Sequence, residues 1–306
     1  MVNNAQTRQF LKDIAGFPPL HLMAPEEIRK VVVANVISDV AELEGTEDHE
    51  LAGPHGPLAI RVYRPRGGDL KRLPVILFFH GGGFVFNRID HYDPMCGKLA
   101  DVTKHAVVSV DYKLAPEHKF PVPIEEALYA AEWVYANAFS LGFDPDRIAV
   151  AGESVGANIA TVVAQQAVKR GTIPIAYQIL LCPLTDYARA HTSKETYADG
   201  YFLTTALLEA CAGHYLRGEP DRTDPLASPI YGDVNGLPPA LVVTAELDPL
   251  RDEGEAYARK LAEHGVQVTL KRYPGMIHMF YALTDIFDDA ADVYELIRKE
   301  LTAIAV

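Results

Sequence analysis

Short apolar runs rich in β-branched residues alternate with helix-like stretches along most of this chain of 306 residues. The runs lie at residues 74–80, 106–112, 147–152, 177–182, 240–245 and 266–273. Helical patterning lies at about 94–104, 123–138, 155–170, 251–264 and 287–303. Continuous apolar runs of this length are typical of strands that are covered on both faces. The alternation therefore predicts an α/β fold, in which a mostly parallel central sheet is flanked by helices.

The chain outside this alternation predicts further elements. Helical patterning at about 5–15 and 25–37 precedes two extended segments at about 40–51 and 58–64. Residues 183–239 form an interval that is longer than a simple crossover, and we expect an insertion there with a helix at about 204–217. Because binding groups of parallel sheets lie at the carboxyl ends of the strands, this insertion could roof an active site.

The charge and the cysteines indicate which partners to expect. With 28 basic and 41 acidic residues, the chain has a net charge of −13, which repels nucleic acid and anionic lipid headgroups. Cys96, Cys182 and Cys211 lack the spacing of a metal site, and we interpret them as reduced thiols of a cytoplasmic protein. The start shows no signal-peptide pattern, and no apolar run approaches the ~20 residues of a membrane helix. We expect no nucleic-acid, membrane, metal or cofactor partner.

Between a strand run and a helix, Gly152–Glu153–Ser154–Val155–Gly156 matches G-x-S-x-G, the pattern of a nucleophile elbow. Its glycines leave room for a sharp turn that would expose the Ser154 hydroxyl. Ser154 could equally cap the helix that follows, so the pattern by itself decides nothing. A serine nucleophile needs a histidine base and a carboxylate that orients the histidine. The presence of these two partners therefore decides between the interpretations.

The base must come late in the chain, because the order in such a fold is serine, acid, histidine. His264 lies in the last turn of a predicted helix, where an imidazole interacts favourably with the helix dipole. His278 lies in a loop just past the last strand, where a base could reach Ser154. We choose His278 as the base, with a buried structural histidine as the alternative.

The acid must come from the segment after the run at 240–245. Asp252 and Glu253 begin a helix, so the helix dipole explains them without chemistry. Asp248 precedes a proline, which favours an extended loop conformation. We choose Asp248 as the orienting carboxylate, with Glu246 as the competitor.

Three consecutive glycines, residues 81–83, follow the run at 74–80 although glycine loses extra entropy on folding. Attack on a carbonyl puts negative charge on its oxygen, and backbone N–H donors must approach that oxygen without a Cβ in the way. We assign these donors to Gly82, Gly83 and Val155, the last of which follows the candidate nucleophile. His80 falls outside the expected order, and we interpret it as a brace of the glycine loop.

The motifs together resemble the hormone-sensitive-lipase family of α/β-hydrolases, which contains many bacterial carboxylesterases. The resemblance rests on HGGGF at 80–84, DYKLAPEHKFP at 111–121, GESVGAN at 152–158, DPLRDEG at 248–254 and GMIHMF at 275–280. It implies one catalytic domain over 1–306 with a helical cap at about 1–40 and 185–225. It also implies a triad of Ser154, Asp248 and His278 and an oxyanion hole of Gly82, Gly83 and Val155.

Two residues depart from the family pattern, which usually has Ala and Gly where this chain has Val155 and Ala157. The Val155 amide survives the change, although the branched side chain could crowd the acyl pocket. Ala157 adds a Cβ where helix and strand pack closely. We expect altered rate or substrate range rather than loss of activity.

Several aromatic residues are candidates for lining a substrate pocket. They are Phe84, Tyr187, Tyr201 and Phe202. Ordinary packing of the cap on the body explains each residue of the cap equally well. The segment 111–121 shapes a loop, from which we also expect hydrogen bonding to the elbow at Glu153.

The resemblance predicts a serine carboxylesterase that hydrolyses short- to medium-chain esters through an acyl-enzyme. An amidase or peptidase could use the same three residues, and a binding protein could use the scaffold without turnover. The run at 266–273 would be an edge strand if it is the last of the sheet, and such edges commonly pair. A homodimer is therefore a further hypothesis.

Overall fold

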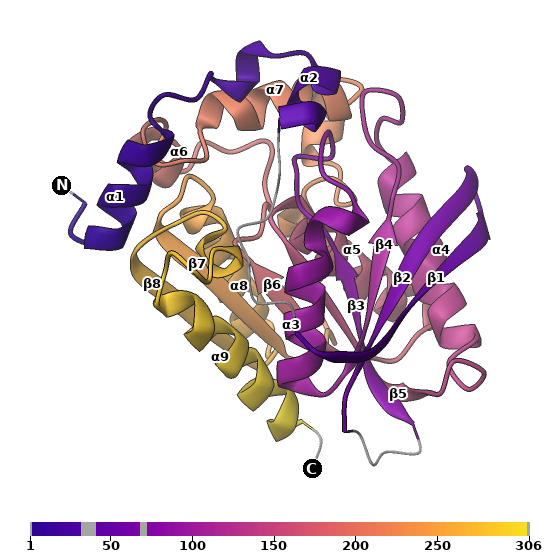
Figure 1. The fold of residues 1–306 in the computed structure, drawn as a ribbon. Coiled ribbons are helices and arrows are strands. Elements are labelled where there is room, and N and C mark those ends of the chain that lie inside the picture. The colour runs from indigo at the N-terminus through magenta and orange to yellow at the C-terminus, as the bar shows by residue number, and fades with distance from the viewer. Residues whose placement is uncertain (1, 32–40, 68–71, 305–306) are drawn as a thin grey trace.

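The computed structural model describes residues 2–31, 41–67 and 72–304, which contain one eight-stranded sheet (Figure 1). Its strands are β1 (Leu43–Gly53), β2 (Gly56–Pro65), β3 (Leu73–Phe79), β4 (Ala106–Asp111), β5 (Phe143–Glu153), β6 (Ile175–Leu181), β7 (Ala240–Leu247) and β8 (Val268–Ile277). The order across the sheet is β1-β2-β4-β3-β5-β6-β7-β8. β2 runs antiparallel to both its neighbours, and the other neighbouring pairs are parallel. The predicted α/β fold is confirmed.

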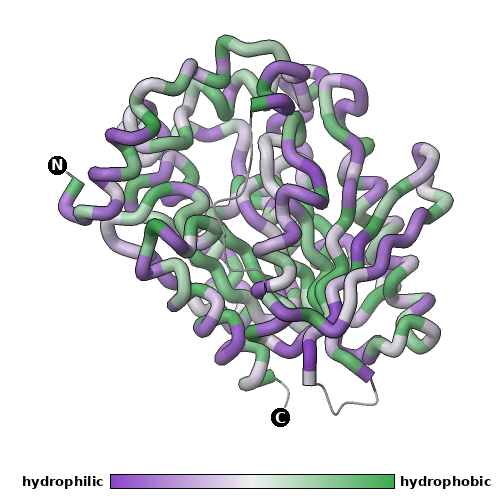
Figure 2. The backbone as a smooth tube through the Cα atoms, in the orientation of Figure 1, coloured by the Kyte–Doolittle hydropathy of each residue, from purple (hydrophilic) through white to green (hydrophobic). Residues whose placement is uncertain are grey.

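Helices cover both faces of the sheet because successive side chains of a strand point to opposite sides. In β3, Val75, Leu77 and Phe79 join a buried cluster with residues of α4 (Val122–Ala136), α5 (Val155–Arg170) and α8 (Arg251–Glu263). The alternate residues Ile76 and Phe78 pack with α3 (Asp93–Thr103) and α9 (Asp289–Ala303) on the other face. Figure 2 shows the hydrophobic residues concentrated along the central strands. This two-sided burial explains the continuous apolar runs of the sequence.

Four further helices gather on one side of the molecule, beyond one end of the sheet (Figure 1). They are α1 (Ala5–Ile14), α2 (Pro25–Val31), α6 (Thr192–Thr196) and α7 (Thr205–Tyr215). Short 3-10 helices η1 (Leu20–Leu22), η2 (Ile89–Tyr92), η3 (Glu219–Thr223), η4 (Pro229–Tyr231) and η5 (Phe280–Ala282) occur in the connections. Residues 32–37 of the second predicted N-terminal helix lie outside the described residues. That these helices act as a cap remains a proposal.

The insertion after β6 is tied to the body by a buried carboxylate. Oε1 of Glu253, in the first turn of α8, accepts hydrogen bonds from the backbone N–H groups of Thr185 at 2.7 Å and Asp186 at 3.1 Å. Nζ of Lys194 lies 2.7 Å from its other oxygen. The sequence explained Glu253 by the helix dipole alone, whereas the structure gives it an anchoring contact to the insertion.

Among the described residues, β8 lies at one edge of the sheet, which is the condition under which the run at 266–273 could pair with a second copy. Whether two copies pair through this edge remains a prediction. Among the helices within the described ranges, none is both long and apolar enough to cross a membrane.

The helix α5 approaches the sheet so closely that glycine is required at the contact. A Cβ added to Gly156 would lie 2.0 Å from the carbonyl oxygen of Phe79, and one added to Gly152 would lie 2.2 Å from the carbonyl of Gly156. No flexible side chain is involved that could move away. The two glycines of the elbow are therefore fixed by backbone contact between β3, β5 and α5.

We expect Gly156→Ala to lower the free energy of unfolding by about 3 kcal/mol, because backbone must move to admit the methyl group. Gly213→Ala is the matched control, since Gly213 lies within α7 with nothing within 4 Å of an added Cβ. This control should stabilise the helix by about 0.5–1 kcal/mol. Urea denaturation measures both values, and equal effects of the two substitutions would contradict the close approach.

Candidate active site

The register of the sheet brings the candidate residues to the end of the sheet at which the parallel strands have their carboxyl ends. Phe79 of β3 pairs with Gly152 of β5, so the glycine loop and the elbow leave the sheet side by side. Leu247 of β7 pairs with Ile277 of β8, and Asp248 and His278 are the next residues of these strands. Parallel strands end together, so segments distant in sequence converge at their carboxyl ends.

Ser154 occupies the turn between β5 and α5 in a strained backbone conformation, with φ 57° and ψ −119°. A non-glycine residue rarely adopts such a positive φ and costs about 1–3 kcal/mol there. Ser154 stands at the N-cap position of α5, but its side chain makes no capping hydrogen bond, so the capping interpretation is wrong. Only 6% of the residue is exposed, and its carbonyl accepts a hydrogen bond from the Leu184 N–H of the insertion at 3.2 Å.

Asp248 and His278 form a buried pair. The Nδ1 atom of His278 lies 2.7 Å from Oδ2 of Asp248, and the other oxygen of Asp248 accepts a hydrogen bond from the Leu250 N–H at 2.9 Å. Burial alone would lower the pKa of His278, but the charge and hydrogen bond of Asp248 outweigh it and hold that pKa well above the ordinary value. A proton on Nδ1 shared with the carboxylate leaves Nε2 as the basic nitrogen.

The competing residues have other roles. His264 ends α8, where its Nδ1 lies 2.8 Å from the carbonyl oxygen of Lys260, as expected for a structural histidine. Glu246 accepts a hydrogen bond from the backbone N–H of Gly275 at 2.6 Å and so supports the loop that leads to His278. Neither residue contacts Ser154 among the described interactions.

Each glycine of the triplet has a separate steric reason. A Cβ on Gly81 would lie 1.6 Å from Oε1 of Glu153, so the missing side chain makes room for that carboxylate. Gly82 and Gly83 have φ values of +114° and +63°, which disfavour other residues. A Cβ on Gly83 would also lie 2.5 Å from Sγ of Cys211 on α7. The triplet therefore fits the loop between the elbow and α7.

The amides assigned as oxyanion donors lie in the glycine loop after β3 and at the first residue of α5. Among the described residues, none accepts a hydrogen bond from the backbone N–H of Gly82, Gly83 or Val155. The side chain of Val155 is fully buried, and Ala157 belongs to the same hydrophobic cluster on the α5 face of the sheet. Both departures from the family pattern are thus accommodated by core packing.

His80 braces the glycine loop, in agreement with the sequence interpretation. Its Nδ1 lies 2.7 Å from the carbonyl oxygen of Gly81, and its ring stacks on Tyr112 with centroids 4.2 Å apart. The Tyr112 hydroxyl donates to the carbonyl oxygen of His80 at 2.6 Å. Burial lowers the pKa of His80, so this imidazole is neutral near pH 7. The segment 111–121 therefore contacts His80, which corrects the expected hydrogen bond to Glu153.

Glu153 instead binds two tyrosines that the sequence analysis missed. Tyr92 of η2 and Tyr281 of η5 donate their hydroxyl protons to its two carboxylate oxygens, at 2.5 Å and 3.2 Å. Burial raises the pKa of Glu153, and His278 and both hydroxyls oppose that rise. No motif in the sequence marks either tyrosine, because both approach through loops from other strands.

Cys182, directly after β6, is a second neighbour that the sequence did not predict. Its Sγ and ligand atoms of Asp248 and His278 lie within 4.8 Å of one another, and all three residues are buried. Burial raises the pKa of the Cys182 thiol to about 11, so the thiol is protonated near neutral pH. Because metals bind the thiolate, the group is better suited to hydrogen bonding than to metal binding.

The four candidate pocket residues fall into two separate groups. Phe84 stacks on Tyr215 of α7 with ring centroids 3.9 Å apart, and Tyr187 approaches the same ring at 6.2 Å. Tyr201 instead packs edge-on against Tyr197 at 5.1 Å. Phe202 is 39% exposed and packs edge-on against Phe10 of α1 at 5.6 Å. Tyr201 and Phe202 therefore contact other residues of the insertion and α1, whereas Phe84 and Tyr187 both approach the Tyr215 ring of α7.

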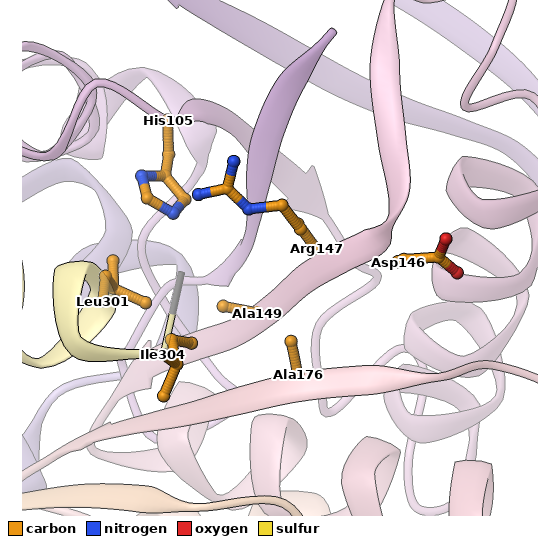
Figure 3. A pocket seen from close by; sticks show the side chains of 7 residues that line it. All are labelled: His105, Asp146, Arg147, Ala149, Ala176, Leu301 and Ile304. Atoms are coloured by element: carbon orange, nitrogen blue, oxygen red, sulfur yellow. The ribbon is translucent and has the colours of Figure 1, made fainter. Parts of the chain in front are cut away.

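A small pocket also occurs at the opposite end of the sheet (Figure 3). Its lining residues are His105, Asp146, Arg147, Ala149, Ala176, Leu301 and Ile304. In Figure 3, Arg147 extends toward His105 while Asp146 points away. Arg147 lies in the first half of β5 and Ser154 follows the last residue of that strand, so roughly 20 Å separates them. This pocket takes no part in the chemistry at the carboxyl ends.

Comparison with known proteins identifies the family. The model of a family described as alpha/beta hydrolase fold matches residues 76–282, more than half of the chain. An ethyl acetate hydrolase of Pseudomonas putida is 36% identical over 92% of this chain and 91% of its own length. An arylesterase of Saccharolobus solfataricus is 35% identical over 86% of this chain and 84% of its own.

Solved structures agree with these relatives. A hyperthermophilic esterase from the archaeon Pyrobaculum calidifontis has a TM-score of 0.93 and 38% identity, covering 100% of this chain and 99% of that one. An ester hydrolase from the metagenome of Lake Arreo, complexed with a derivative of bipyridine phosphonate, has a TM-score of 0.94 and 37% identity, covering 98% of each chain. The chain therefore belongs to the hormone-sensitive-lipase-like family of α/β-hydrolases and is a carboxylic ester hydrolase.

Proposed function

We propose that the protein is a serine carboxylesterase in which Ser154 is the nucleophile, His278 the base and Asp248 the orienting carboxylate. The hydrogen bond of 2.7 Å between Asp248 and His278 carries this proposal. It fixes the imidazole tautomer whose free nitrogen can take a proton from a serine hydroxyl. The strained turn at Ser154, next to the ends of the other strands, supports the role of nucleophile.

The proposed reaction has two halves. Nε2 of His278 takes the hydroxyl proton as Oγ of Ser154 attacks the ester carbonyl carbon, and negative charge moves to the carbonyl oxygen. The amides of Gly82, Gly83 and Val155 stabilise that oxygen. The alcohol then leaves with the proton from His278, which gives an acyl-enzyme. Water, activated by the same nitrogen, releases the acid and restores Ser154.

Short- to medium-chain esters are the proposed substrates. A relative with 36% identity is named for the hydrolysis of ethyl acetate, an ester of small acid and small alcohol. Phe84, Tyr187 and Tyr215 form an aromatic group around α7, next to the glycine loop. Such side chains would form a compact apolar pocket, which favours a short acyl group over a long one. An activity panel over acyl lengths tests this proposal.

An amidase or peptidase remains the alternative within the same chemistry. The relatives named above are ester hydrolases, which favours the ester. Comparing p-nitrophenyl acetate with p-nitroacetanilide separates the two, since they share the acetyl group and the p-nitrophenyl ring and differ in the atom, oxygen or nitrogen, at the bond that is cleaved. Faster turnover of the amide would replace the esterase proposal.

We also propose a reducing, cytoplasmic location and a homodimer through β8. Cys96, Cys182 and Cys211 are free and buried, which suits a compartment without disulfide formation. The edge position of β8 suits pairing between copies. Light scattering that gives the mass of one chain at working concentration would remove the dimer.

Ser154→Ala should abolish hydrolysis of p-nitrophenyl acetate or butyrate, since no other group at the site replaces the attacking hydroxyl. A loss of at least about 10⁴-fold in kcat is expected. A fluorophosphonate should label the wild-type protein at Ser154 and leave the variant unlabelled. Retained activity, or ligand binding without labelling, would favour a different nucleophile or a binding protein.

Activity should fall as the pH drops, because the base must be neutral. Asp248 raises the pKa of His278, so the acid limb of kcat/KM should have its midpoint above the ordinary histidine value of about 6.5. Asp248→Asn should lower that midpoint and reduce kcat by about 10³–10⁴-fold. If kcat/KM did not change between about pH 5 and 8, a range that includes the ordinary histidine pKa of ~6.5, His278 would not be the base.

Gly83→Ala should lower kcat about 10- to 100-fold by displacing an oxyanion donor. The added Cβ would lie 2.5 Å from Sγ of Cys211 on α7, and the alanine would have to adopt the positive φ of Gly83. Gly142→Ala is the control, because Gly142 has φ +72° with nothing within 4 Å of its added Cβ. The control shares the backbone strain but should keep wild-type kcat. Equal losses in both variants would show that strain alone is responsible.

A further inference from the structure

The carboxylate of Glu153 is buried at the centre of the site although the proposed reaction does not use it. Only 1% of Glu153 is exposed. Its Oε1 atom occupies the space that a side chain at position 81 would need. Gly81, the first glycine of the triplet, therefore leaves room for this carboxylate. A buried acid of this kind is costly unless it is paired and hydrogen-bonded.

The partners of Glu153 come from the loops that carry the chemistry. The hydroxyl of Tyr92 donates to Oε1 at 2.5 Å and accepts a hydrogen bond from the backbone N–H of Gly81 at 3.1 Å. The hydroxyl of Tyr281, three residues after His278, donates to Oε2 at 3.2 Å. One carboxylate thus joins the glycine loop, the elbow and the histidine loop.

His278 lies between two carboxylates. Asp248 holds its Nδ1 at 2.7 Å, and Oε2 of Glu153 lies 3.8 Å from its Nε2. The second distance is beyond a hydrogen bond but close enough for a strong charge interaction in a buried site. The same oxygen, Oε2, accepts a hydrogen bond from the Tyr281 hydroxyl at 3.2 Å.

We propose that Glu153 is a positioning residue that stabilises the imidazolium form of His278, and that Tyr281 keeps Glu153 from pairing with Nε2 directly. This proposal rests on the function proposed above, because the imidazolium forms only when Nε2 accepts the serine proton. Without the Tyr281 hydroxyl, Oε2 would compete with Ser154 for the same nitrogen. The arrangement thus supplies charge to the base without blocking it.

Other titratable groups face this cluster. Asp248 and Cys182 contact His278 from the ends of β7 and β6, and Tyr112 approaches Glu153 from the end of β4. Burial raises the pKa values of Tyr92, Tyr112 and Tyr281 well above the ordinary value, so all three hydroxyls stay protonated in the working range. The groups whose charge can change in the working range are therefore His278, whose pKa Asp248 raises against the effect of burial, and Glu153, whose pKa burial raises.

Two substitutions should move the titration of His278 in opposite directions. Glu153→Gln keeps the shape and removes the charge, so the pKa of His278 should fall by about one unit and kcat/KM by about 10-fold. Tyr281→Phe frees Oε2 to approach Nε2, so that pKa should rise by about half a unit while kcat/KM at pH 7 falls. Tyr294→Phe is the control, because the buried Tyr294 hydroxyl has no hydrogen-bond partner within the described residues. It should leave both quantities unchanged.

NMR titration of the His278 ring protons gives the pKa directly, and the acid limb of kcat/KM gives it through activity. Opposite shifts in the two variants support the proposal. No shift in either variant, or shifts in the same direction, would overturn it and leave Glu153 a packing role. If Glu153→Gln fails to fold, the sign of the Tyr281→Phe shift decides alone. A wild-type protein without esterase activity would refute the proposed function, whereas the NMR titration would still test the influence of Glu153 on His278.

Discussion

Close backbone contact at the carboxyl ends of β3 and β5 is the constraint on which the rest of the site depends. At Gly81, Gly152 and Gly156, an added Cβ would lie between 1.6 Å and 2.2 Å from a carboxylate oxygen or a carbonyl group. This contact places the glycine loop beside the elbow, in which Ser154 has a φ of 57°. The surrounding sheet maintains this strained conformation of Ser154, since a packed core on both faces prevents the turn from relaxing.

The meeting of the strand ends also determines the electrostatic interactions among the charged residues of the site. Asp248, Glu153 and His278 are almost fully buried, so their charges interact in a medium that screens them less than water. Each carboxylate is hydrogen-bonded to N–H or O–H groups of neighbouring loops, which makes its burial tolerable. Geometry and charge therefore have one origin, namely strands that end together in a parallel sheet.

The sequence predicted those features that leave a local pattern. Apolar runs gave the strands, and the position of Asp248 before a proline and of His278 past the last strand separated them from Glu246 and His264. The contacts of Tyr92, Tyr281 and Cys182 left no such pattern, because tertiary contacts between loops created them. Tyr201 and Phe202 were aromatic residues in the right interval, yet their surroundings depend on how the insertion and α1 pack. Sequence spacing does not encode that packing.

A crystal structure of the wild-type protein after reaction with a phosphonate ester tests the central claim most directly, because the adduct imitates the charged intermediate. We expect a covalent bond from phosphorus to Oγ of Ser154, with the phosphoryl oxygen about 2.7–3.1 Å from the amides of Gly82, Gly83 and Val155. His278 should remain bonded to Asp248 with Nε2 directed at the adduct. Phosphorus on another residue, or a phosphoryl oxygen turned away from these amides, would contradict the account.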